Sequence, residues 1–341
     1  MIQASLNHVL DRHDLSRDEA CEAMTAIMRG EVTPAQIAGF LVALRAKGET
    51  ADEIAGCADA MRAHVLAVKP ERDDLVDTAG TGGDGARTLN ISTAAALVAA
   101  AAGAGVAKHG NRAVSSASGS ADVLEALGFE LEQQPARIAR SIDELGFGFL
   151  FAPAHHPAMR HAAAVRKELA TRTVFNVLGP LTNPAGARAQ IVGVYSDELV
   201  RTIAEVLVQL GARRAFVVHG AGGIDELSPC GPNRVCEVVG GGVRERTIDP
   251  AELGIEPCGP DELRGGSPAE NAEAIRSVFA GAPGAPRHAI LLNAAGAIAA
   301  AGHTDDLRDG LELAREAVDS GAAAERLDRL VAFSRAGKVS A

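Results

Sequence analysis

The chain has 341 residues and a formal net charge of -11; 47% of its residues are hydrophobic and only 3% are aromatic. This length is enough to bury a large core and predicts two domains, one of them small. The acidic balance argues against nucleic-acid binding, which needs an excess of Lys and Arg. No apolar run reaches the roughly 18 residues of a membrane span. The N-terminus lacks a basic-then-apolar signal pattern, so we expect a cytoplasmic protein without nucleic-acid or membrane partners.

The cysteines and histidines argue against a transition-metal site. No CxxC pair occurs, and the ten histidines show neither HExxH nor HxxxH spacing. An odd number of scattered cysteines predicts reduced, mostly buried thiols rather than a disulfide framework or a zinc site. The cysteines are Cys21, Cys57, Cys230, Cys236 and Cys258.

The first part of the chain carries helical signals only. Ser16 with Glu19 and Thr50 with Glu53 have the spacing of capping boxes, and Pro34 stands at a first helical position. Short helices of this kind gain most of their stability from packing. We therefore expect them to pack on one another or on a partner subunit.

After Lys69-Pro70 the pattern changes to strands alternating with helices, which predicts a mostly parallel, covered sheet. We assign residues 1–70 to a small all-helical domain and residues 71–341 to a larger α/β domain. Part of 157–190 is expected to cross back to the helical domain, leaving a cleft between the two. We expect strands at 75–78, 106–108, 148–151, 190–195, 215–219 and 288–293, and helices at 92–102 and 120–127.

Two glycine- and serine-rich loops follow the first two predicted strands. One reads GTGGDGARTLNIST from Gly80, and the other reads KHGNRAVSSASGS from Lys108. No Asp or Glu occurs between Gly85 and Ala121, although the whole chain is acidic. Glycine loops that lead into helices present backbone N–H groups to anions, and ligands of open α/β sheets bind at the carboxyl ends of the strands. The loops therefore predict a site for an anionic ligand with several phosphates.

The first loop also matches the GxGxxG pattern of dinucleotide-binding proteins. That fingerprint expects an acidic residue roughly 20 positions further on, and this region is free of acids. A phosphate or diphosphate cradle is the better interpretation. Asn90, Ser92 and Thr93 stand where the following helix begins, either as caps alone or also as phosphate or metal contacts.

An adjacent acid pair, Asp225-Glu226, is the best candidate for holding Mg²⁺. The pair lies in GGIDELSP, after a predicted strand end and behind several glycines. Polyphosphate sites generally use Mg²⁺ held by one or two carboxylates and substrate oxygens. Asp84, inside the first loop, is expected near the ligand, where it bonds a ribose or tightens the loop.

Seven motifs follow one another along the chain: GTGGDG from Gly80, NIST from Asn90, KHGNRAVSS from Lys108, GSADVLEALG from Gly119, HPAM from His156, RTVFNVLGPLTNPA from Arg172 and DELSP from Asp225. With these motifs the sequence resembles the anthranilate phosphoribosyltransferase family over almost the whole chain. Arg87 is a local departure, because a small polar residue is more usual there, and an extra cation is tolerable beside a phosphate loop.

The resemblance implies a Mg²⁺-dependent enzyme of tryptophan biosynthesis. Such enzymes transfer the 5-phosphoribosyl group from phosphoribosyl diphosphate (PRPP) to the amine of anthranilate, giving N-(5-phosphoribosyl)anthranilate and diphosphate. Their fold is like that of the nucleoside phosphorylases, with a small helical domain and a larger α/β domain. The active site lies at the hinge, and they are usually homodimers joined through the helical domain.

The resemblance also implies site residues. Without the resemblance, Arg166, in VRKEL, is typical of a helix surface. His109 is open between a loop hydrogen bond and ligand contact, and His156 is expected to line the same pocket as Arg166. Catalysis is assigned to Lys108, Asn111 and Arg166, anthranilate binding to Gly80, Asn111 and Arg166, and Mg²⁺ binding to Ser92, Asp225 and Glu226. PRPP binding is assigned to Gly80, Gly83, Asp84, Thr88, Asn90, Ile91, Ser92, Thr93, Lys108, His109, Gly110, Asn111, Arg112, Ala113, Val114, Ser115, Ser116 and Ser120.

Two alternatives remain, one of them another enzyme and the other a different class of function. A pyrimidine nucleoside phosphorylase has a similar architecture and a related glycine loop, but it handles inorganic phosphate and a nucleoside. A catalytically silent relative that binds nucleic acid needs a basic groove and a degraded substrate site. The acidic charge and the intact KHGNR and DELSP stretches favour the transferase.

Overall fold

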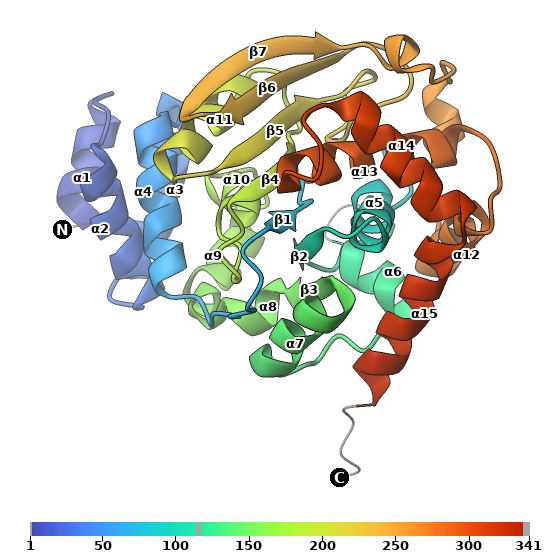
Figure 1. Ribbon diagram of the computed structural model, residues 1–341. Coiled ribbons are helices and arrows are strands. Elements are labelled where there is room, and N and C mark those ends of the chain that lie inside the picture. The colour runs from blue at the N-terminus through green and yellow to red at the C-terminus, as the bar shows by residue number, and fades with distance from the viewer. Residues whose placement is uncertain (1, 114–116, 337–341) are drawn as a thin grey trace.

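A computed structural model describes residues 2–113 and 117–336 of the chain. Val114, Ser115 and Ser116, which we predicted as PRPP contacts, lie outside the described residues. At the centre is a seven-stranded sheet in the order β3-β2-β1-β4-β5-β6-β7 (Figure 1). The first five strands in this order are parallel, and β6 and β7 are antiparallel additions. The strands are β1 (Leu75–Asp77), β2 (Gly105–Gly110), β3 (Phe147–Phe151), β4 (Ala189–Gly193), β5 (Arg214–His219), β6 (Asn233–Val239) and β7 (Gly242–Ile248).

Four helices precede the sheet and lie to one side of it in Figure 1: α1 (Ile2–Leu10), α2 (Arg17–Met28), α3 (Pro34–Lys47) and α4 (Ala51–Ala63). The predicted capping boxes of α2 and α4 are both present, and Pro34 is the first residue of α3. The later helices are α5 (Ile91–Ala101), α6 (Ser120–Ala126), α7 (Pro135–Leu145), α8 (Ala152–His155), α9 (Arg160–Leu169), α10 (Phe175–Leu178), α11 (Leu199–Gln209), α12 (Pro268–Phe279), α13 (Ala285–Ala301), α14 (Leu307–Asp319) and α15 (Ala322–Arg335).

The two faces of the sheet belong to two large hydrophobic cores. Phe216 and Val218 of β5 pack into a core with α5 and α12 to α15, while Ala215 and Val217 pack toward α11 and the first four helices. This alternation follows from the two-residue period of a strand. Residues of α9 and α10 join the second core. The predicted class, a helical unit beside a larger and mostly parallel α/β unit, is confirmed.

One predicted strand is wrong. Residues 288–293 lie inside α13, a helix of 17 residues that is buried almost all round. A short apolar run is compatible with a buried helix as well as with a strand, and periodicity alone does not separate them. We also did not predict the β6–β7 hairpin, where charged residues of the outer strand pair across to β6.

The cysteines follow the prediction in part. All five are free thiols, but only Cys57 and Cys236 are buried, and the other three are half-buried. Every helix in the described part of the chain is too short or too polar to cross a bilayer.

Candidate active site

The first glycine loop follows β1 and lies directly against the acid pair. The Gly82 amide donates to Asp225 Oδ2 at 2.6 Å, and a Cβ at Gly80 would meet the same oxygen at 2.6 Å. Gly82 and Gly83 have φ angles of 66° and 77°, a region that favours glycine. Glycine is therefore needed here both for the turn and for the close approach of the loop to Asp225.

Asp84 tightens this loop, which was one of the two roles that we left open. Its Oδ1 accepts from the Ala86 amide at 3.0 Å and its Oδ2 accepts from the Asp225 amide at 3.2 Å. The same carboxylate raises the pKa of Asp225. Asp84 thus joins the glycine loop to the acid-bearing loop of residues 220–231.

The two carboxyl groups of the acid pair are half-buried, and the charge of Asp225 acts on Glu226. Burial and the neighbouring Asp84 raise the pKa of Asp225 to about 7. Burial and the charge of Asp225 raise the pKa of Glu226 to about 8. The backbone amide of Ser92, in the first turn of α5, donates to Glu226 Oε1 at 3.1 Å, and its side chain also bonds to Glu226. The structure therefore brings together all three residues predicted to hold Mg²⁺.

Lys108 is placed differently from our expectation of a direct grip on phosphate. Its side chain is 1% exposed, and Nζ donates to Thr78 O at 2.9 Å and Thr78 Oγ1 at 3.1 Å. Burial lowers the pKa of Lys108, whereas the nearby Asp77, Glu226 and Asp225 raise it. Lys108 therefore lies beneath the first loop as the counter-charge of Asp77, Asp225 and Glu226.

The second loop is held by α6. Asp122 Oδ2 accepts from the amides of Ala113 and Gly119, both at 2.9 Å, which joins the two ends of the loop. The Arg112 guanidinium is paired with Asp122 at 3.0 Å and with Glu125. Arg112, which we predicted as a PRPP contact, is thus compensated by acids from the following helix.

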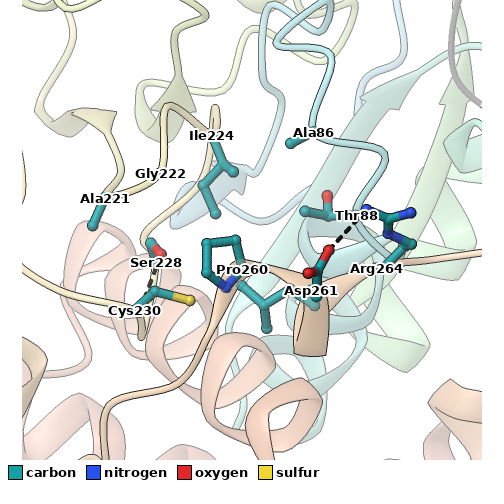
Figure 2. A pocket seen from close by; sticks show the side chains of 11 residues that line it. Ala86, Thr88, Ala221, Gly222, Ile224, Ser228, Cys230, Pro260, Asp261 and Arg264 are labelled. Carbon is teal, nitrogen blue, oxygen red and sulfur yellow. Dashed lines mark hydrogen bonds and ion pairs between the residues drawn. The ribbon is translucent and has the colours of Figure 1, made fainter.

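Several predicted PRPP residues serve as supports behind the loops. The Asn90 side chain bonds Ser118 and Asn271, each through Oδ1 at 2.9 Å, so it braces the second loop rather than capping α5. Ile91 and Thr93 are fully buried. Thr88 bridges to Arg264 and lines a separate small cavity (Figure 2).

The main cleft has a volume of about 720 Å³, which is in the range for a small-molecule site. It lies between the strand-end loops and the helical side of the molecule. Of the predicted residues, Gly80, Gly83, His109, Gly110, Asn111, Arg112, Ala113, Ser120 and Arg166 line it. The remaining residues that line the cleft are Met61, Ala79, Thr81, Gly82, Gly119, Ala152, Pro153, His156, Pro157, Met159, Arg160, Ala163, Phe175, Asn176, Gly179, Pro180 and Thr182.

Two buried histidines form one wall of the cleft. His109 Nε2 lies 3.2 Å from His156 Nε2, and His109 Nδ1 lies 2.9 Å from Gly179 O. Burial, together with the neighbouring imidazoles, lowers the pKa of His109 to about 3 and that of His156 to about 4. Both rings are therefore neutral near pH 7 and present a largely apolar, aromatic wall.

Arg166 provides the cleft with an uncompensated cation. Its guanidinium carbon lies 5.0 Å from the centroid of the Phe175 ring, and burial lowers its pKa. Its side chain forms no ion pair or hydrogen bond with any residue of the described ranges 2–113 and 117–336. A half-buried arginine with all its donors free is suited to bind a carboxylate bidentately.

The contacts of Arg172 were missed by sequence reasoning. Its guanidinium donates to Gly83 O and lies 3.9 Å from the centroid of the Tyr195 ring, while its own carbonyl accepts from Arg45 of α3. Arg172 thus links the helical side to the first glycine loop. The only signal for it was its place at the start of RTVFN, because contacts between distant segments leave no local pattern.

The donor set at the acid pair suits Mg²⁺ better than a metal that needs a full protein cage. Within the described residues no group of three or more His, Cys, Asp and Glu side chains is arranged to hold a metal. Two carboxylates and one hydroxyl are oxygen ligands, and Mg²⁺ typically takes one or two carboxylates, with substrate phosphates and water completing its shell. Asp225, Glu226 and Ser92 fit this pattern.

Comparisons with known proteins first define the class. Residues 72–324 match the family described as "Glycosyl transferase family, a/b domain", and residues 3–65 match "Glycosyl transferase family, helical bundle domain". The chain is 53% identical over 337 residues to the anthranilate phosphoribosyltransferase of Anaeromyxobacter sp. (strain Fw109-5), covering 99% of this chain and 100% of the relative. The chain belongs to the anthranilate phosphoribosyltransferase family.

Solved structures agree with this assignment. The crystal structure of the Thermus thermophilus anthranilate phosphoribosyltransferase has a TM-score of 0.92 and 51% identity, covering 97% of this chain and 99% of that one. The Saccharomyces cerevisiae enzyme in complex with PRPP and Mg has a TM-score of 0.90 and 28% identity, covering 98% of each chain. Its complex with 4-fluoroanthranilate has a TM-score of 0.86 and 27% identity, with the same coverage.

Proposed function

We propose that this chain transfers the 5-phosphoribosyl group of PRPP to the amine of anthranilate, in tryptophan biosynthesis. The observation that carries the proposal is the cleft itself. It joins a glycine loop and a second anion loop at one end to the uncompensated Arg166 and an apolar wall at the other. A diphosphate ester and an aromatic carboxylate are the two ligands that such a cleft fits. The yeast relative's complexes with PRPP and with 4-fluoroanthranilate support this choice.

PRPP is assigned to the strand-end side of the cleft. The loop from Gly80 to Gly83 lines this side of the cleft, and the first turn of α5 lies behind it against Glu226. Backbone N–H groups and the helix dipole favour negative charge there. Lys108 acts from below as a positioning residue. Its charge offsets that of Asp225 and Glu226 and holds Thr78 at the end of β1.

Anthranilate is assigned to the helical side. Arg166 binds the carboxylate, and the ring lies against the wall formed by His109 and His156, near Asn111. This arrangement turns the amine toward the ribose. An aromatic amine is unprotonated near neutral pH, so the reaction needs orientation rather than a strong general base. Displacement at the anomeric carbon gives the ribose oxocarbenium character, and the negative charge that leaves with diphosphate is the charge the loop amides stabilise.

Mg²⁺ is assigned to Asp225, Glu226 and Ser92. When bound, the ion neutralises charge on the diphosphate leaving group. The raised pKa values of the two carboxyl groups mean that the pair loses protons when it takes a cation. The relatives with PRPP and Mg or with Mg bound support the choice of metal.

The helical side and the α/β side are proposed to move as two domains. Residues 1–70 with part of 157–190 form one, and the rest of 71–341 forms the other, with the cleft at their hinge. The bond from the Arg172 guanidinium to Gly83 O is the contact that such a motion would rearrange. A homodimer joined through the helical domain is proposed from the resemblance to the family, and its interface would cover Leu10 and Val42, which are exposed on α1 and α3. The free thiols suit the proposed cytoplasmic location.

The proposal is tested by following anthranilate fluorescence with the purified chain, PRPP and Mg²⁺. We expect the signal to disappear, and we expect EDTA to prevent its loss. The matched control omits PRPP. A folded protein that leaves the fluorescence unchanged under these conditions would overturn the proposal, and phosphorolysis of pyrimidine nucleosides would be assayed next.

A further inference from the structure

Two cysteine thiols meet outside the cleft, behind the loop that carries the acid pair. Cys230 Sγ lies 2.7 Å from Cys258 Sγ, and both side chains are half-buried. Both cysteines are free thiols. They are far apart in the sequence, and neither takes part in the reaction proposed above.

One of the two thiols, that of Cys230, borders a cavity of about 130 Å³. Cys230 lines it together with Pro260 and Asp261, and its backbone amide donates to Ser228 Oγ at 3.2 Å (Figure 2). Cys258 comes just before η4 (Pro260–Leu263), which supplies the opposite wall. Small-molecule access to Cys230 is therefore possible from this side.

The segment after Cys258 supports the first glycine loop. The Leu89 amide donates to Leu263 O at 2.9 Å, and the Gly265 amide donates to Arg87 O at 2.9 Å. Cys230 itself follows the acid pair by four positions. A covalent bond between the two sulfur atoms would therefore connect the acid-bearing loop to the segment that supports the start of α5.

We propose that Cys230 and Cys258 form a reversible intramolecular disulfide by exchange with a small-molecule disulfide such as oxidised glutathione. The Cys230 thiolate attacks one sulfur of the external disulfide, which breaks that S–S bond and releases one thiol. The Cys258 thiolate then attacks Cys230 Sγ of the mixed disulfide and releases the second thiol. The chain loses two electrons and two protons, and the external disulfide gains both.

The surroundings of the sulfur atoms give the two cysteines different roles. Burial and the contact with Cys230 raise the pKa of Cys258 to about 12, so Cys258 keeps its proton while the pair is reduced. Cys230 is the cysteine that lines the cavity, so it meets the external disulfide first. Cys258 is then the resolving thiol, already in contact with the sulfur that it must attack.

The test uses the full chain in glutathione buffers of increasing oxidation, with thiols trapped by alkylation and masses measured on the intact protein and its peptides. We expect the wild-type chain to lose the mass of two hydrogen atoms, to retain no glutathione, and to yield a Cys230–Cys258 peptide pair that dithiothreitol reverses. Cys258→Ser and Cys258→Ala should each retain glutathione on Cys230. Cys230→Ser should form no bridge, and the half-buried control Cys21→Ser should behave as wild type.

Two results would overturn the proposal. In one, the wild-type chain keeps glutathione on Cys230; in the other, it keeps both thiols free in a buffer that already modifies Cys258→Ser. A second readout is thermal unfolding. Closing a loop of this length predicts a rise of about 5 °C in the Tm of the oxidised chain. The rise should be absent in the Cys230 and Cys258 variants, and its absence in the bridged wild-type chain would refute the structural coupling of the two loops.

Discussion

Replacing Arg166 by alanine should weaken anthranilate binding and leave PRPP binding intact. The side chain is half-buried, lies over Phe175 at 5.0 Å, and forms no ion pair with the described residues, so its donors are all available to a ligand. Hydrogen bonds to a charged partner contribute about 1.5–3 kcal/mol. Since each 1.4 kcal/mol is a factor of ten, we expect the KM for anthranilate to rise about 10- to 100-fold.

Steady-state kinetics with each substrate varied in turn measure this effect. Arg160→Ala is the matched control, because Arg160 lines the same cleft but is exposed. Aniline lacks the carboxylate, so it separates loss of the carboxylate contact from other effects of the substitution. It should react poorly with the parent protein and no more poorly with the Arg166 variant. Equal loss of affinity for anthranilate and PRPP, or an effect no greater than that of Arg160→Ala, would refute the assignment and point to a structural role.

Three further predictions concern the acid pair, its packing and the histidine wall. Asp225→Asn should abolish Mg²⁺-dependent activity with little change in Tm. Because the pKa values of Asp225 and Glu226 are raised to about 7 and 8, Mg²⁺ affinity measured by calorimetry should rise from pH 6 to pH 8. The metal-free protein should lose stability as pH rises from about 4 to 8, because the unfolded state gives up these protons at a lower pH than the folded state does. Unchanged metal dependence in the variant would contradict the assignment. Gly193→Ala should destabilise the protein by about 3 kcal/mol, seen as a lowered Tm, because its Cβ would lie 1.5 Å from Asp225 O; a Tm equal to wild type would contradict the packing. The rings of His109 and His156 should show no NMR titration between pH 5 and pH 8. Because their pKa values are lowered in the folded state, the free energy of unfolding should decrease as pH falls below about 6.5. An NMR titration of either ring near pH 6.5 would contradict their burial.

Local signals predicted most of the architecture. The capping boxes at Ser16 and Thr50 begin helices as expected, and the loops that follow β1 and β2 lie at the same edge of the sheet. These features depend on residues close together in the chain, and their geometry follows from backbone preference. The strand predicted at 288–293 failed because burial on all sides removes the periodicity that distinguishes a helix from a strand.

The partners of the site side chains were harder to predict. The burial of Lys108 against Thr78, the pairing of Arg112 with α6 and the link from Arg172 to Gly83 all depend on which segments the fold brings together. An acid-free stretch of sequence therefore indicated where a phosphate site lies but not which cation is free. Among the cleft residues that the structure describes, Arg166 is the half-buried cation without an ion pair, and the sequence alone placed it on a helix surface.

The most direct test of the central claim is the stoichiometry of the reaction, measured by ³¹P NMR of PRPP with anthranilate, Mg²⁺ and the purified chain. We predict that one diphosphate and one phosphoribosylated anthranilate appear for each PRPP consumed, and that PRPP is stable when anthranilate is omitted. Consumption of PRPP without loss of anthranilate, or cleavage of a nucleoside driven by inorganic phosphate in its place, would contradict the claim.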